Sequence, residues 1–206
     1  YYFIDIQTSQ VADFDRVIKN VKGFVELNRV PILRGRILKV NGVNANKVKI
    51  DPEKSWILRN DRGITWSSSP PPNTKIVLGK WWPHNYAGPP LVSLGAAAAE
   101  AMQLTVGDTL TIDVLGRPII AKISSLRRIN WGNLGINFVM IFSPGLIENA
   151  PQTHIATVKI NRKISVDLEY IITEQFKNIT AIKVRDVLDQ ITAVIERIAK
   201  LIRIVS

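Results

Sequence analysis

The spacing of apolar residues predicts a strand–helix–strand unit at the start of the chain. Alternating apolar and polar positions indicate strands, and apolar positions three or four apart indicate a helix with one buried face. Pro31 is expected to interrupt the strand region, because proline cannot donate to a sheet ladder. The expected elements are a strand over residues 3–6, a helix over 11–21 between Ser9 as N-cap and Gly23, and strands over 24–27 and 32–40.

The middle of the chain changes to short strands and turn-forming residues. Alternating apolar residues on both sides of Leu115-Gly116-Arg117-Pro118 predict a hairpin. An alanine-rich stretch over residues 94–103 predicts a short helix, and the Ser- and Pro-rich residues 67–72 predict an exposed loop. The expected strands are residues 76–78, 110–114, 119–123 and 138–142.

The last block repeats the strand–helix–strand order of the first. Strands over residues 155–160 and 179–184 flank a helix over 166–176. Asp186 then caps a long helix that runs to Ser206, and its apolar positions lie close to a heptad seam.

The two ends of the chain are predicted to form one subdomain. A helix needs a sheet against which to bury its apolar stripe, and each terminal block is too small to supply one alone. The expected fold is therefore an α+β sandwich built from residues 1–58 and 151–206, with a β-rich subdomain over residues 59–150 inserted into it. This arrangement would place both chain ends on the same subdomain.

Composition places the chain among globular proteins and limits its chemistry. Its hydrophobic fraction of 46% is ordinary for a packed core, and the absence of cysteine excludes disulfides, thiolate metal sites and a cysteine nucleophile. No apolar run approaches the roughly 18 residues of a membrane span. The chain begins at Tyr1 without an initiator Met or a signal sequence, so we expect it to be a fragment of a longer protein.

A net charge of +10, from 27 Lys and Arg against 17 Asp and Glu, leaves two interpretations open. A basic surface attracts nucleic acid, so a basic binding module for nucleic acid or another anionic polymer is the alternative function. The basic residues are spread along the whole chain, which favours a solvated surface and no nucleic acid partner. A strongly salt-dependent affinity for DNA or RNA would identify the alternative.

The sequence lacks the motifs of catalysis and nucleotide binding. Its two histidines, His84 and His154, are far apart, and there is no zinc-binding helical pair and no nucleophile elbow. The phosphate-binding loop Gly-x-x-x-x-Gly-Lys-Ser/Thr does not occur, so ATP hydrolysis is not expected within this chain. We therefore predict no enzyme activity, no cofactor and no metal site.

An ordered series of short motifs runs through the middle of the chain. It consists of Gly79-Lys80-Trp81-Trp82, residues 106–113 (Val-Gly-Asp-Thr-Leu-Thr-Ile-Asp), Gly116-Arg117, Ser125-Leu126-Arg127, Trp131, Asn137-Phe138, Ile141-Phe142 and Pro144-Gly145. This series resembles the large extracytoplasmic region of ABC-transporter permeases of the FtsX-like and MacB-like type, especially the YbbP-like branch. Residues 2–7 and the long C-terminal helix resemble the points where that region leaves and rejoins the membrane.

The resemblance implies a porter-like α+β subdomain built from both ends, with a small β-rich subdomain inserted. It also implies a bacterial inner-membrane protein whose membrane helices flank this domain and hold it in the periplasm. A cognate ABC ATPase, on a separate chain or domain, would drive movement of a hydrophobic or lipid-like substrate. A periplasmic protein could be a further partner.

Trp81, Trp82 and Tyr86 form the densest aromatic cluster of the sequence. They are candidates for contact with a lipid-like substrate or a partner. Packing of the inserted subdomain explains such residues more readily, because buried tryptophans find local acceptors for their N–H groups. Trp131 is expected in the core.

The last turns of the C-terminal helix are candidates for a membrane-proximal stalk. Ile198 and Leu201 continue the apolar seam, and Lys200 and Arg203 could reach the lipid head groups while their stems lie on apolar surface. A coiled-coil seam is the competing interpretation.

Overall fold

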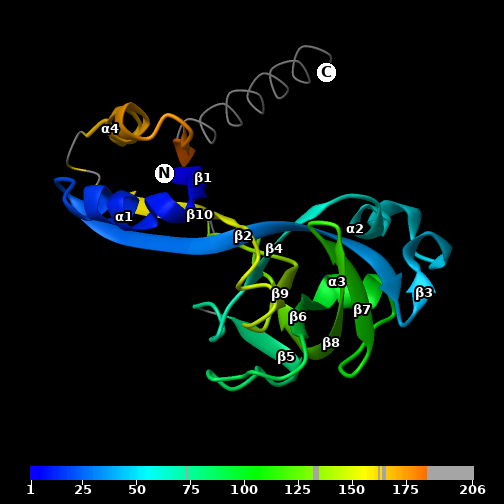
Figure 1. The fold of residues 1–206 in the computed structure, drawn as a ribbon. Helices are drawn as coiled ribbons and strands as arrows, with labels where there is room; N and C mark the ends of the chain where they lie inside the picture. The colour runs from blue at the N-terminus through cyan, green and yellow to red at the C-terminus, as the bar shows by residue number, and fades with distance from the viewer. Residues whose placement is uncertain (73, 132–134, 162, 164–165, 185–206) are drawn as a thin grey trace, which may run out of the picture. The chain divides into compact units, whose positions relative to one another are not determined.

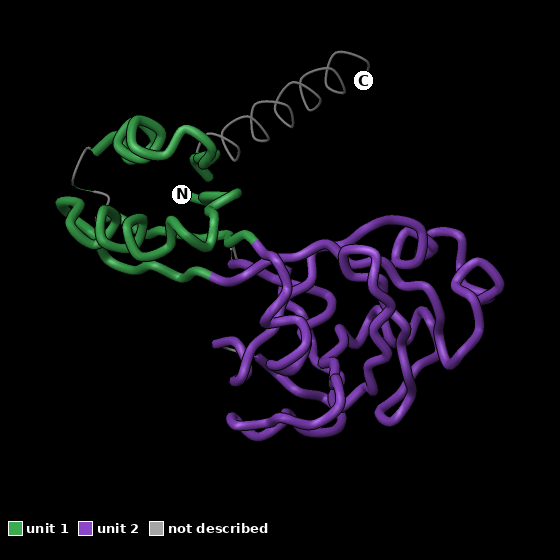
Figure 2. The backbone as a smooth tube through the Cα atoms, viewed as in Figure 1, with its two compact units in different colours: residues 1–29, 153–206 green, residues 30–152 purple. Residues whose placement is uncertain are grey.

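The computed structural model describes residues 1–72, 74–131, 135–161, 163 and 166–184 of the chain. Helices and strands are both present and the fold is α+β, which confirms the class predicted from the sequence. The chain divides into two compact units, which Figure 2 distinguishes by colour. Unit 1 contains Tyr1–Arg29 and the chain from Thr153 onward, and unit 2 contains Val30–Gln152.

Unit 1 is a small sheet with two helices (Figure 1). Its strand order is β11-β1-β10-β2, and β1 is antiparallel to both β10 and β11. The elements are β1 (Tyr2–Gln7), the 3-10 turn η1 (Thr8–Gln10), α1 (Val11–Lys19), the first part of β2 (Phe24–Val40), β10 (Thr153–Ile160), α4 (Leu168–Gln175) and β11 (Thr180–Ile182). The helix α1 starts after Gln10 rather than after Ser9, which lies in η1.

The core of unit 1 joins residues from the two ends of the chain. On α1, the buried residues Phe14 and Ile18 lie four positions apart and therefore share one helix face. The ring of Phe14 lies 5.4 Å from that of Phe3 and 6.3 Å from that of Phe176, measured between centroids. On β10, buried and half-buried residues alternate from Thr153 to Val158, as expected for a strand with one covered face.

Strand β2 runs through Pro31 without a break, so the interruption predicted there is wrong. A proline is tolerated where the ladder does not need its missing N–H. Pairing with β4 begins only at Leu33, and the carbonyl of Pro31 accepts a hydrogen bond from the hydroxyl of Thr65 at 2.7 Å.

Unit 2 is built on a closed sheet. Pairings follow the order β2-β4-β9-β6-β8-β7, and β7 pairs with β2 to complete the ring. Closure pairs each of these strands on both sides for part of its length, which removes exposed edges. The bounds are β4 (Arg62–Trp66), β6 (Leu91–Gly95), β7 (Thr109–Val114), β8 (Arg117–Arg128) and β9 (Met140–Phe142), with β3 (Val43–Asn44) paired to β2 and β5 (Lys75–Gly79) to β8.

The inward residues of this closed sheet form the core of unit 2. On β7 the burial alternates strictly, with Leu110, Ile112 and Val114 buried between half-buried neighbours. The short helix α3 (Ala96–Ala101) adds Ala98 and Ala99 to the same core. The hairpin turn predicted around Leu115 and Gly116 has positive backbone angles φ at both residues, and so does the turn at Asn41 and Gly42 between β2 and β3.

Two sequence expectations change in unit 2. The predicted helix over residues 94–103 begins only at Ala96, because residues 91–95 form β6, the strand between β8 and β9. The first unit ends at Arg29 rather than near residue 58, because the second part of β2 pairs with β4 and β7. The helix expected from Asp186 to Ser206 lies outside the described residues.

In the part of the chain that the structure describes, none of the helices combines the length and the apolar character needed to cross a membrane.

The shared core of unit 1 can be tested at Phe14, which is fully buried. We expect Phe14→Ala to lower the free energy of unfolding by about 3–5 kcal/mol. Removing the ring leaves a cavity in the core where residues from the two ends of the chain pack together. Urea unfolding followed by circular dichroism measures this. Lys19→Ala, an exposed change on the same helix, should stay within about 0.5 kcal/mol of the unaltered chain. Equal effects of the two variants would contradict this packing.

A basic groove beside strand β2

A groove of about 820 Å³ lies within unit 2, between the second part of β2 and the segment that follows β3. Residues 36–39 of β2 form one wall, and residues between Asn44 and Arg59 form the other. Figure 1 shows this second segment beside the end of β2. We call it the basic groove, after the Arg36, Lys39 and Arg59 side chains in its lining.

Three short helical turns build the second wall. They are η2 (Ala45–Lys47), η3 (Pro52–Lys54) and α2 (Trp56–Arg59). The Asp51 carboxylate accepts a hydrogen bond from the backbone N–H of Glu53 at 3.0 Å and so caps η3. Ile57 and Leu58 anchor α2 in the core of unit 2, and the guanidinium of Arg62 lies 4.3 Å from the centroid of the Trp56 ring.

A β-bulge in β2 shapes the first wall. Leu33, Gly35 and Ile37 are buried by ordinary alternation, which would also turn residue 39 inward. The pairing with β7 shifts between Ile37 and Lys39, so the extra residue Leu38 resets the alternation. Lys39 is therefore exposed, like Arg36, and Val40 becomes the next buried residue.

The groove lining carries positive charge without acidic residues. Arg36, Lys39 and Arg59 make no ion pair with any described residue, and Asp113, which lies opposite Arg36 in the ladder, does not bridge to it. Residues 34–62 contain eight Lys and Arg against three Asp and Glu. Basic residues occur along the whole chain, as predicted, and half of the surplus positive charge lies in this segment.

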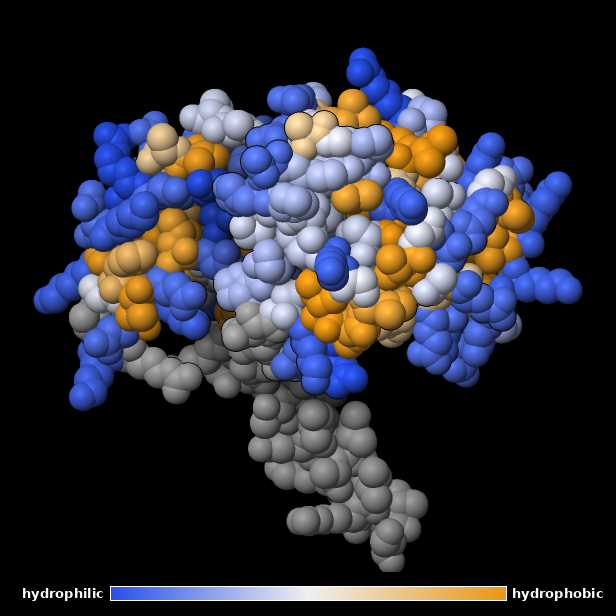
Figure 3. Space-filling model, turned by 90° about the horizontal axis from the view of Figure 1, so that it is seen from below, coloured by the Kyte–Doolittle hydropathy of each residue, from blue (hydrophilic) through white to orange (hydrophobic). Residues whose placement is uncertain are grey.

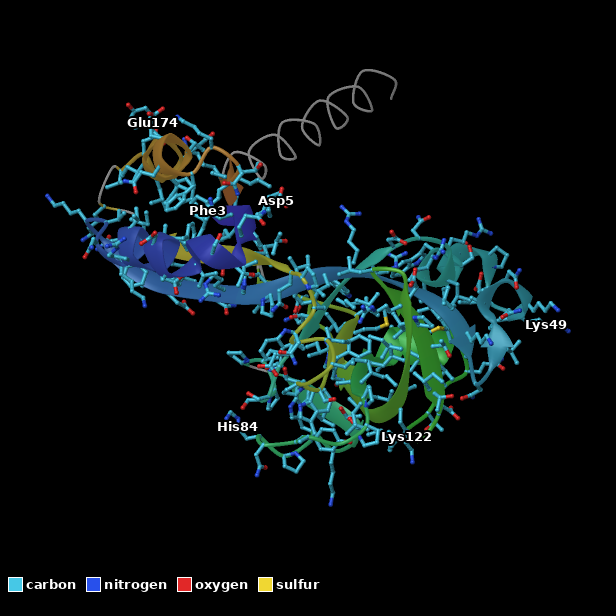
Figure 4. The ribbon with its side chains drawn as sticks, in the orientation of Figure 1. Phe3, Asp5, Lys49, His84, Lys122 and Glu174 are labelled. Carbon is cyan, nitrogen blue, oxygen red and sulfur yellow. The ribbon has the colours of Figure 1, made fainter. Side chains whose placement is uncertain are left out.

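The rest of the lining is largely apolar. Ile37, Val48, Ile50 and Leu58 contribute to it, and all four also pack in or against the core of unit 2. Lys49, labelled in Figure 4, is exposed on the same segment and lies outside this lining. An apolar lining beside unpaired cations suits a ligand with an apolar body and an anionic end.

The aromatic cluster considered as a contact site lies elsewhere in unit 2, where Trp82 and Tyr86 are hydrogen-bonded to nearby loops and the buried Trp81 indole N–H has no partner in the described structure. Trp82 is buried and donates its indole N–H to the carbonyl of Ser67 at 2.9 Å. Its ring lies 4.3 Å from that of Trp81, and the Tyr86 hydroxyl donates to the carbonyl of Pro89 at 2.8 Å. These contacts favour the packing interpretation, and a contact role for the cluster stays a prediction.

Trp131 was expected in the core, and this is wrong: it is 63% exposed. The membrane-proximal stalk residues Ile198, Lys200, Leu201 and Arg203 lie outside the described part of the chain. The face in Figure 3 carries hydrophobic patches between hydrophilic side chains.

The described residues hold no group of three His, Asp or Glu suited to a metal ion, so neither histidine belongs to such a group there. His84 is exposed on a loop, where its Nδ1 lies 3.2 Å from the Ser69 hydroxyl (Figure 4). His154 is buried in unit 1, with its Nδ1 3.1 Å from Nη1 of Arg29, which also binds Asp15 at 3.0 Å.

Arg127 is a buried cation on β8. Its Nη2 donates to the carbonyl of Phe138, and its Nε finds no hydrogen-bond partner in the described structure. Burial lowers the pKa of this guanidinium to about 10, which leaves it charged at neutral pH. Its bond ties β8 to the segment that leads into β9.

The sequence analysis predicted no element between residues 45 and 66 and so missed the groove. Asp51-Pro52 is a helix-start signal, an N-cap residue followed by proline, and it could have identified η3. A local count of Lys and Arg could have identified the charge. The bulge at Leu38 leaves no comparable signal, because it depends on pairing with β7.

Comparisons with known proteins give one significant sequence relative. The chain is 26% identical over 159 residues to an uncharacterized ABC transporter permease, YbbP, of Escherichia coli (strain K12). The match covers 77% of this chain and 18% of the relative. No protein-family profile matches the chain.

Two solved structures are similar. One is a domain of a permease protein from Porphyromonas gingivalis, with 12% identity and a TM-score of 0.41, covering 79% of this chain and 74% of that one. The other is the periplasmic region of MacB from Actinobacillus actinomycetemcomitans, with 10% identity and a TM-score of 0.46, covering 91% and 83%.

The buried His154 predicts a pH dependence of stability. Burial lowers the pKa of His154 first, Arg29 lowers it further and Asp15 partly opposes them. Because the unfolded chain then binds the proton more readily, the free energy of unfolding should fall as the pH drops from about 6.5 through the folded pKa. Urea unfolding at several pH values should show a shallower fall in His154→Gln. His84→Gln, which removes the exposed histidine, is the control, and an unchanged slope in His154→Gln would contradict the prediction.

Proposed function

We propose that the chain is related to the extracytoplasmic domains of ABC-transporter permeases of the FtsX-like and MacB-like type, as its sequence predicted. In this proposal it is the periplasmic domain of an inner-membrane permease. It couples ATP hydrolysis on a separate chain or domain to the movement of a hydrophobic or lipid-like substrate.

The sequence relationship carries this proposal. It extends over 159 residues, and so includes more than the short motif series. The chain spans 18% of the length of that relative, which leaves room in such a protein for membrane helices and other parts. The chain contains no phosphate-binding loop, so the energy of ATP would have to arrive from a partner ATPase.

The composition of the basic groove supports the proposal that the substrate is lipid-like. Its apolar lining and its cations match the two ends of a lipid-like molecule, and its size is within the roughly 300–1,000 Å³ typical of small-molecule sites. This fits a binding role, and we expect no catalysis, because no nucleophile–base pair accompanies the groove.

A basic module for nucleic acid is the second candidate, because residues 34–62 concentrate positive charge. Such a module would bind DNA or RNA with an affinity that falls steeply with salt. The apolar lining of the groove favours the first candidate, since a phosphate backbone would leave it uncovered.

Mechanical coupling is proposed to pass through the sequence from Asp186 to Ser206, which lies outside the described residues. Its apolar positions continue to Leu201, and Lys200 and Arg203 would lie at the lipid head groups. A rigid helix transmits displacement to a membrane helix that follows it.

The parent protein should therefore encode membrane helices directly before Tyr1 and after Ser206. In that protein, Ala199→Pro should uncouple ATP hydrolysis from transport, because proline inside a helix removes a hydrogen bond and costs about 3 kcal/mol or more. ATPase activity and substrate movement measured together in proteoliposomes test this. Ala199→Leu keeps the helix and is the control. Normal transport by the proline variant at normal abundance would refute the proposed role of this segment as a stalk. A parent protein without flanking membrane helices would refute the proposed permease function.

A further inference from the structure

We propose that the basic groove binds a single-chain anionic amphiphile of the lysophospholipid type, with its phosphate at Arg36, Lys39 and Arg59 and its acyl chain along the apolar lining. The inference rests on the proposed function and deepens it by naming the substrate class and the residues that hold it.

The phosphate end follows from the three cations. Each is exposed, and none is engaged by an ion pair to a described residue, so their hydrogen-bond donors are available to a ligand. Arginine presents a planar fork that binds two phosphate oxygens at once, and lysine adds a point charge. No carboxylate in the lining competes for them.

The acyl end follows from the apolar lining. Val48 and Ile50 are only partly buried by the protein, although they pack against the core of unit 2. A ligand that covers them removes apolar surface from water, which is the general driving force for binding an acyl chain. Free phosphate would gain nothing from this surface, and neither would a polynucleotide.

The bulge at Leu38 brings the two ends together. Without it, Lys39 would point into the closed sheet, and the cations would be reduced to Arg36 and Arg59. With it, Lys39 joins the groove next to Leu38, which also lines the groove. Bulges commonly re-aim side chains beside functional sites.

Calorimetry on the 206-residue chain tests the ligand class, with every lipid kept below its micelle concentration. The probe is 1-myristoyl-lysophosphatidylglycerol, and its comparison is 1-myristoyl-lysophosphatidylcholine, with the same chain and no net charge. We expect the anionic lipid to bind at least about tenfold more tightly, and glycerol phosphate to show no saturable binding. Equal affinity for the two lipids, or equal affinity for glycerol phosphate, would overturn the proposal.

Matched variants test the site. The combined Arg36→Gln, Lys39→Gln and Arg59→Gln change should lower the affinity for the anionic lipid at least about tenfold. The control, Arg117→Gln, Lys122→Gln and Arg128→Gln, removes the same charge from exposed residues of β8 and should retain the affinity. Equal losses of affinity in the two triple variants would show that the lipid is attracted to net charge alone. That result would overturn the assignment of the binding site to the groove.

A third variant tests the acyl surface without changing charge. Val48→Ser should lower the affinity for both lipids by a similar factor. Circular dichroism reports whether any variant has lost its fold. Unchanged lipid binding by a folded Val48→Ser chain would overturn the placement of the acyl chain.

A single-stranded oligonucleotide is the last probe. The proposal would be overturned in favour of a polyanion site if the oligonucleotide bound as tightly as the anionic lipid and lost this binding in the combined Arg36→Gln, Lys39→Gln and Arg59→Gln variant. Failure of lipid binding would leave the permease role intact as long as the parent protein couples ATP hydrolysis to transport.

Discussion

The fold of unit 2 depends on the passage of β2 between two partner strands at Gly35. This residue pairs with Arg62 of β4 on one side and with Val114 of β7 on the other. A Cβ at this position would lie 2.9 Å from Cδ1 of Ile64 and 3.1 Å from Cγ2 of Ile112, so a larger residue would displace packed side chains. Glycine at this position therefore lets Ile64 and Ile112 pack where the two partner strands converge.

Strand β2 also links this closure to the rest of the chain. Its first part belongs to unit 1, where it continues the sheet of β10, β1 and β11, and its second part belongs to unit 2. Unit 1 in turn needs both chain ends, because Phe3 and Phe14 pack in the same core as Phe176. Such an arrangement returns the chain to the unit from which it started.

The basic groove is a consequence of how β2 ends. The bulge turns Lys39 outward, and the short helices that follow β3 place Arg59 in the same lining, while Ile57 and Leu58 hold those helices on the core. The permease role rests on a sequence relationship, whereas the ligand class rests on charge and apolar surface within one unit. The ligand proposal builds on the permease proposal, whereas the permease proposal does not depend on the groove.

The sequence by itself determined the α+β class, the resemblance to permeases, the hairpin turn at Leu115-Gly116, and most helices and strands of the chain ends. These follow from local rules: apolar periodicity and the backbone freedom of turn residues. Only the tertiary structure decided the continuity of β2 through Pro31, the strand character of residues 91–95, the exposure of Trp131 and the groove itself. The strand features among these depend on partners distant in sequence, since a ladder supplies the pairing that makes a bulge, tolerates a proline or leaves a lysine exposed.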